Sequence, residues 1–147
     1  MLPRNYRFAV QNVTGQTIAA SGVIVHMRRW KRASDGSITF EATEATVLDN
    51  PSVLAAATIE EPSLLPAPML ATGGYFDGTA QDNSSDKWEG ATVEFVVTAP
   101  SLANGPVILL FKRSTDGGTV FDDDSQALEM ERIQFITAAT KRLSFQI

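Results

Sequence analysis

Hydrophobic and polar positions alternate along much of the chain, which is the pattern of a β-strand with one buried face. Tyr6, Phe8 and Val10 set this period near the N-terminus. Similar patterns predict about eight strands in all, over residues 6–11, 17–32, 38–40, 69–76, 92–98, 107–113, 128–137 and 142–147. Residues 34–37 and 114–118 contain Asp-Gly pairs and predict hairpin turns. The pattern indicates an all-β protein, an antiparallel β-sandwich of jelly-roll-like winding.

The apolar members of these strands form the expected core, which comprises Tyr6, Phe8, Val10, Val23, Val25, Phe95, Val97, Ile108, Leu110, Ile133, Phe135 and Phe145. Residues 1–147 are expected to form a single domain with a long proline-rich loop at about 48–70. A turn of helix is predicted at 52–57, and 77–90 is polar and rich in turn residues. Because such long loops are unusual in a compact domain, we expect both segments to contact other subunits.

Composition narrows the classes of function. The 147 residues include no cysteine, so disulfides, thiolate catalysis and cysteine-based metal sites are excluded. The net charge of −5 argues against nucleic acid as a partner. No apolar run approaches the roughly 18–20 residues of a membrane-spanning helix, and the first residues do not resemble a secretory signal. We therefore expect neither nucleic acid nor a membrane among the partners.

No catalytic or cofactor site stands out. His26 is the single histidine and lies inside a strand pattern, and the Gly-x-Ser-x-Gly signature is missing. The spacing of the glutamates selects no catalytic pair. Oxygen-rich loops at 77–86 and 122–124 leave calcium open, although neither has the spacing of an EF-hand. We expect a protein that is not an enzyme and needs no cofactor.

Basic and aromatic residues gather in Arg28, Arg29, Trp30, Lys31 and Arg32. Alternation along a strand places Arg28, Trp30 and Arg32 on one face and Arg29 and Lys31 on the other. Tryptophan and arginine are enriched in protein interfaces, so this strand end and Trp88 are interface candidates. The expected acidic counterparts on a neighbouring chain are Asp122, Asp123 and Asp124, or the region from Glu60 to Glu94. We expect charge reversal at Arg28 and Arg29 to slow assembly and leave the domain folded.

Two resemblances add to this interpretation. Ser114-Thr115-Asp116-Gly117-Gly118-Thr119-Val120-Phe121 resembles the Asp-box of sialidase-like propellers, where the motif is a structural hairpin. The resemblance implies that Ser114 and Asp116 tie the turn and have no catalytic role.

Residues 90–147, in which Asn104-Gly105-Pro106-Val107 leads a strand into this hairpin, resemble small virion proteins of tailed bacteriophages. That resemblance implies a head-decoration (cement) or head–tail accessory protein in the virion, assembled in the host cytoplasm. Its partners would be copies of itself or other virion proteins, with no small-molecule substrate. A carbohydrate-binding or adhesion module remains the alternative, with Trp30, Tyr75 and Trp88 as stacking residues.

Overall fold

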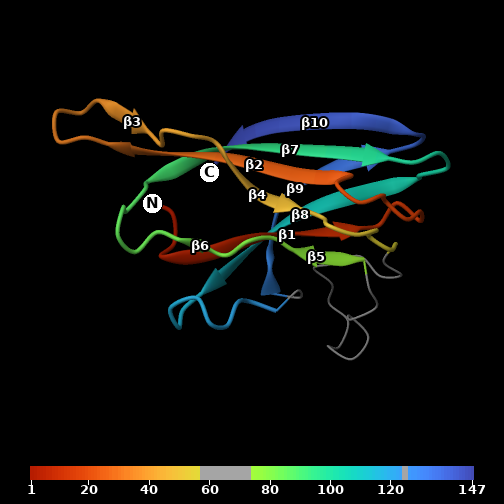
Figure 1. Cartoon of the computed structure of the whole chain (residues 1–147), viewed down its shortest axis with the longest axis horizontal. Coiled ribbons are helices and arrows are strands. Elements are labelled where there is room, and N and C mark those ends of the chain that lie inside the picture. The colour runs from red at the N-terminus through yellow and green to blue at the C-terminus, as the bar shows by residue number, and fades with distance from the viewer. Residues whose placement is uncertain (57–73, 124–125) are drawn as a thin grey trace.

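Two antiparallel sheets of five strands each pack face to face in this computed structural model, which describes residues 1–56, 74–123 and 126–147 (Figure 1). The first sheet contains β1 (Asn5–Asn12), β5 (Tyr75–Asp77), β6 (Gln81–Asp82), β8 (Gly105–Ser114) and β9 (Leu128–Phe135). The second contains β2 (Val23–Arg32), β3 (Ile38–Phe40), β4 (Ala45–Asp49), β7 (Gly90–Ala99) and β10 (Ala139–Gln146). The expected all-β sandwich is confirmed.

Consecutive strands lie in different sheets at β1–β2, β4–β5, β6–β7, β7–β8 and β9–β10. As a result β1 pairs with β8 in one sheet while β2 pairs with β7 in the other. The strands β9 and β10 then extend the two sheets on the same side, next to β8 and β7. One pair of strands thus wraps around another across the gap, which is jelly-roll-like winding.

The core lies between the sheets, where period-two patterns place the apolar faces. Of the expected core residues, nine are buried in this main cluster: Tyr6, Phe8, Val10, Val23, Val25, Phe95, Val97, Ile133 and Phe135. Phe145 is partly buried and packs against it. Ile108 and Leu110 are buried on the opposite face of β8, in a smaller cluster with Ala9 and Ala127. Both faces of β8 are covered, and its sequence is an unbroken apolar run. The alternation that would show which residues point toward the core is therefore missing from this strand.

Ten strands are present in the described residues, and two of them, β4 and β6, were not predicted. The strand predicted over 17–32 starts at Val23, because a turn at residues 19–22 precedes it. The helical turn predicted at 52–57 is wrong over 52–56, where Leu54 instead forms a bridge with Ile18; residue 57 lies outside the described residues. The loop expected over 48–70 begins later, since Leu48 and Asp49 belong to β4, and 57–70 lie outside the described residues.

A partly buried cluster of charges occupies the outer face of the first sheet. Asp77 on β5 forms ion pairs with Arg7 Nη2 at 2.5 Å and with Lys112 Nζ at 2.9 Å. The Arg7 guanidinium also lies 4.4 Å from the ring centre of Phe121. Because Lys112 is 3% exposed, its ammonium depends on this pairing. Within the described part of the chain, no helix is long and apolar enough to cross a membrane.

Candidate protein interface at the end of the sandwich

The β2–β3 hairpin runs past the rest of its sheet at one end of the molecule (Figure 1). β7 accompanies β2 as far as the Trp30–Gly90 pair, whereas β3 pairs with Trp30, Lys31 and Arg32. The turn at residues 33–37 closes through a hydrogen bond from the amide of Ala33 to the carbonyl of Ser37. We call residues 28–41 the arm. All five basic and aromatic interface candidates of β2 belong to it.

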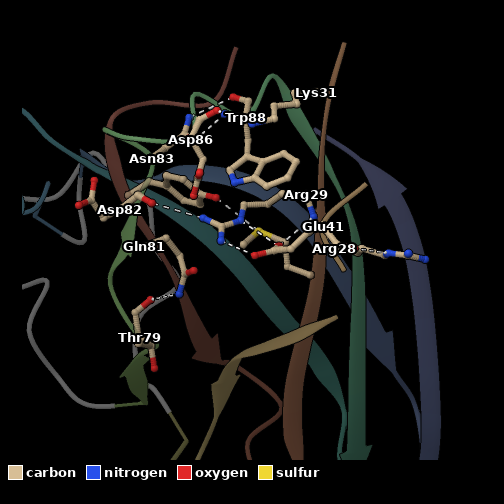
Figure 2. Close-up of polar contacts among 12 residues, drawn as sticks. Arg28, Arg29, Lys31, Glu41, Thr79, Gln81, Asp82, Asn83, Asp86 and Trp88 are labelled. Atoms are coloured by element: carbon tan, nitrogen blue, oxygen red, sulfur yellow. Dashed lines mark hydrogen bonds and ion pairs between the residues drawn. The ribbon is translucent and has the colours of Figure 1, made fainter. Parts of the chain in front are cut away.

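Arg29 fixes the base of the arm from within the molecule. Its Nε donates to Glu41 Oε2 at 3.0 Å and its Nη2 donates to Glu41 Oε1, which makes a two-point pair across the hairpin (Figure 2). Nη1 donates to the carbonyl of Asp82 at 3.3 Å. Both partners are largely buried, with side chains 14% and 20% exposed. The hydrogen bond from Arg29 holds the pKa of Glu41 below its usual value.

Trp88 completes this inner side of the arm. Its side chain is buried, and the Lys31 ammonium lies 4.7 Å from the centre of its ring. Lys31 Nζ also donates to the carbonyl of Asp86 at 3.2 Å. The neighbouring loop is closed by buried Asn83, whose Nδ2 donates to the carbonyls of Trp88 and Leu2 and whose Oδ1 accepts from the amide of Trp88. The structure therefore brings Arg29, Lys31 and Trp88 together, as a support inside one chain.

Tyr6 marks the point where this support meets the core. Its hydroxyl lies 3.5 Å from the sulfur of Met27, and no part of the residue is exposed. Burial raises the pKa of Tyr6 to about 12, an effect that the positive charge of Arg29 partly opposes. Tyr6 of the core, Arg29 and Glu41 therefore connect the hydrophobic core to the base of the arm.

The outer side of the arm is open. Arg28 and Arg32 are exposed, and Figure 2 shows Arg28 pointing away from the Arg29 cluster. Arg28 Nε donates to the carbonyl of Glu41 at 3.0 Å, and its guanidinium lies 5.3 Å from the ring centre of Phe40. Phe40 and Ile38 are 48% and 55% exposed. The predicted alternation of faces is correct, and it assigns different tasks to the two sets: Arg29 and Lys31 support the arm, while Arg28 and Arg32 project from it.

The acidic candidates lie on the long β8–β9 connection. Asp122 accepts from the amide of Arg113 at 2.9 Å, and Asp123 accepts from the amide of Gln126 through its carbonyl. Both line a cleft of about 250 Å³ together with Asp116. Asp124 and the acidic residues Glu60 and Glu61 lie outside the described residues. Nothing within the chain joins Asp122 or Asp123 to the arm among the contacts of the described residues.

The turn that begins this connection is tied by its own side chains. Asp116 accepts hydrogen bonds from the amides of Thr119 and Val120 and from the hydroxyl of Ser114. The Ser114 hydroxyl in turn accepts from the amide of Gly118 at 3.0 Å. These bonds, led by that from the Val120 amide, hold the pKa of Asp116 below its usual value. Ser114 and Asp116 therefore act on the conformation of the turn.

The three stacking residues expected of a carbohydrate-binding module lie apart from one another. Trp88 is 8% exposed, Trp30 lies on the outer face of the second sheet, and Tyr75 lies on the outer face of the first. They form no common surface on which a sugar could stack. Among the described residues no group of three acidic or histidine side chains is placed to hold a metal ion, and Asp77 is already paired with Arg7 and Lys112.

Sequence reasoning missed Glu41 and Asn83. Glu41 was one of many glutamates, and its role depends on the hairpin bringing it opposite Arg29. The Asp35-Gly36 turn was the signal that could have aligned β2 with residues 38–41. Asn83 resembled any other polar loop residue, because burial of a side chain in a loop leaves no periodic pattern. The segment 77–90 therefore packs on its own domain at Asn83 and Trp88, and its expected contact with other subunits stays a prediction.

The sequence matches no protein-family model, no curated protein and no solved structure at a significant level.

Proposed function

We propose that the chain is a non-enzymatic structural subunit of a tailed-phage virion, a head-decoration or head–tail accessory protein that acts through protein–protein contacts. The observation that carries this proposal is the arm. It projects from the sandwich, its base is fixed by the Arg29–Glu41 pair, and its outer side exposes Arg28, Arg32 and two apolar side chains. A rigid arm of this kind is preorganised to bind a neighbour, because little conformational entropy is lost on contact.

Mixed basic and apolar character defines the expected partner surface. Exposed Ile38 and Phe40 gain free energy when a neighbour covers them, and Arg28 and Arg32 require acidic groups beside that apolar contact. The cleft on another copy supplies the carboxylates of Asp116, Asp122 and Asp123 against one cation, Arg113, which pairs with Asp122. A contact between two different surfaces of the same chain is heterologous, so it builds rings or extended arrays. Multi-copy assembly is what a subunit of a particle requires.

The experiment is negative-stain microscopy combined with sedimentation velocity on the purified chain. We expect rings, tubes or other multi-copy assemblies at low ionic strength, and binding to empty phage capsids if the chain is a decoration protein. Assemblies should dissociate as salt rises, because charge pairs at an interface rim are screened. A chain that forms no multi-copy assembly at low salt and binds no capsid is not the proposed subunit.

A further inference from the structure

The strand β10 forms an outer edge of the second sheet. It pairs with β7 over eight residues without a register shift, and within the described residues no strand pairs with its other edge. The corresponding edge strand of the other sheet, β9, pairs with β8 through a shifted register at Leu109 and Leu110. Bulges of this type blunt an edge against further pairing. The regular edge of the molecule is therefore β10.

The hydrogen bonds at the C-terminus show which groups this edge presents. Ile147 and Ala91 exchange both backbone hydrogen bonds, at 2.9 and 3.0 Å. In an antiparallel ladder such pairs alternate, so the odd-numbered residues of β10 bond to β7 and the even-numbered residues direct their N–H and C=O groups outward. The outward residues are Thr140, Arg142, Ser144 and Gln146, and all four are exposed.

From this geometry we infer that β10 pairs with β10 of a second copy, antiparallel and about a two-fold axis at Leu143. This inference rests on the proposed function, for which it supplies the lateral contact between subunits. In that register Arg142 lies opposite Ser144 of the other copy, and Thr140 lies opposite Gln146. All four outward residues of each strand then find hydrogen-bond partners, and the two sheets join into one.

Charge selects this register over its neighbours. Moving the axis to Arg142 would place the two Arg142 side chains opposite each other, which is destabilising. With the axis at Leu143, Arg142 lies opposite an uncharged serine, and Ser144 pairs within its own chain with Glu94. Glu94 accepts from Arg142 of its own chain at 3.0 Å, and in the joined sheet Glu94 of one copy also lies in the same cross-strand row as Arg142 of the other, with Ser144 between them. Lys141, which would otherwise guard the edge, donates to the carbonyl of Gln134 at 2.6 Å.

Apolar side chains along the open side of the sandwich support the same contact. Leu143, Phe145 and Ile147 are only partly buried on the inner face of β10. An apolar cleft of about 200 Å³ opens beside Ile147, lined in part by Leu128 and Met130. In the inferred register Ile147 lies opposite Ala139 of the other copy, so the pairing removes part of this apolar edge from water in both copies.

Single-cysteine cross-linking tests the register, since the chain has no cysteine of its own. Leu143→Cys places two thiols opposite each other at the axis, within the range of Cα separations that a disulfide accepts. Gln146→Cys is the matched control, because its symmetry mates lie about 20 Å apart along the strand. We expect Leu143→Cys to form a disulfide-linked dimer at least ~10-fold faster than Gln146→Cys under mild oxidation. Equal rates would overturn the inference.

Sedimentation equilibrium on edge variants tests the pairing itself. Ser144→Pro removes an outward N–H, and an edge strand tolerates proline there, so the dimer should weaken by ~10-fold or more while far-ultraviolet circular dichroism is retained. Ser144→Ala keeps the N–H and should dimerise as the parent does. Ser144→Arg gives a second variant whose fold is supported by Glu94 and whose dimer suffers repulsion from Arg142. If the parent is monomeric at about 1 mM, or if both Ser144→Pro and Ser144→Arg dimerise normally, the inference is wrong.

The same experiments separate this interface from the arm. A two-fold contact between identical edges closes at a dimer. A chain that forms dimers and no larger species supports the β10 pairing and contradicts multi-copy assembly through the arm. Large assemblies that persist in Ser144→Pro without a dimer intermediate would contradict the β10 pairing and support multi-copy assembly through the arm.

Discussion

Adjacent arginines of β2 differ in what they contribute to the domain. Arg29 makes a two-point pair with Glu41 and is largely buried, whereas Arg28 is exposed. We expect Arg29→Ala to lower the free energy of unfolding by about 1–3 kcal/mol, since it leaves Glu41 without its partner. Arg28→Ala should change it by no more than about 0.5 kcal/mol. Urea unfolding measures both values, and equal effects would contradict the division of tasks within the arm.

This difference corrects the expectation that charge reversal at Arg28 and Arg29 leaves the domain folded. Arg29→Glu would place two carboxylates against each other in a largely buried position. A loss of assembly in that double variant would therefore report unfolding as well as interface charge. The exposed pair Arg28 and Arg32 is the proper probe of the interface.

Tyr6 gives the domain a sensitivity to alkaline pH. Its pKa is about 12 in the folded chain against 10.0 for a free side chain. Above pH 10.0 the unfolded chain releases this proton while the folded chain retains it, so unfolding becomes more favourable as pH rises. The stability present below that pH should fall by roughly 2–3 kcal/mol by about pH 12. Urea unfolding of the parent and of Tyr6→Phe across this range measures the difference, and parallel curves would show that Tyr6 does not titrate as described.

At the scale of elements, strands were predictable where one face is buried and the period of two is clear. The segments at β7 and β10 have this pattern. The segment at β1 alternates in sequence, although both of its faces are largely buried. The strand β4 was missed because Val47 and Leu48 are both buried, which breaks the alternation, and because Pro51 follows closely. It pairs with β2 through a shifted register at Val25 and His26. Its formation depends on tertiary contacts that a local pattern does not contain.

The candidate interface was predictable as a set of residue types but not as a geometry. Composition and alternation located Arg28–Arg32 and separated the two faces correctly. The role of Arg29 depends on Glu41, which is twelve residues away and reaches it through the hairpin register. Trp88 reaches the same place from a loop before β7, and no local pattern connects it with Lys31. Contacts between distant segments were therefore the missing part.

The loop before β7 depends on one buried side chain. Asn83 satisfies the carbonyls of Leu2 and Trp88 and the amide of Trp88. We expect Asn83→Ala to cost about 2–4 kcal/mol, because the Leu2 carbonyl and the Trp88 amide lose this partner and the Trp88 carbonyl keeps only its bond from the Leu2 amide. Asn83→Asp should keep the contact to the amide and lose both donated bonds. Urea unfolding gives the cost, and the fluorescence of Trp88 in a Trp30→Phe background should shift to longer wavelength as its ring becomes exposed; an unchanged spectrum would show that Asn83 does not hold Trp88.

At the scale of the whole molecule, both proposed interfaces lie on one sandwich. In the proposal the β10 edge pairs with itself and closes at two copies, while the arm contacts a different surface and extends the assembly. The two lie on different parts of the second sheet, since β10 and β3 are at its opposite edges. Dimers joined through β10 would then present two arms each, so weak arm contacts would be reinforced by multivalency.

The final prediction concerns the arm within such an assembly. Arg28→Glu combined with Arg32→Glu reverses two exposed charges that the fold does not need. The variant should retain its free energy of unfolding to within about 1 kcal/mol and still form the β10 dimer, because neither residue lies on that edge. It should lose multi-copy assembly at low salt, as repulsion replaces attraction to acidic surface on a neighbour. The control is Arg4→Glu with Lys87→Glu, which makes the same change in net charge at exposed positions outside the arm. If both variants lose assembly equally, net charge governs association and the arm has no specific role; if neither does, the outer face of the arm is only solvated surface.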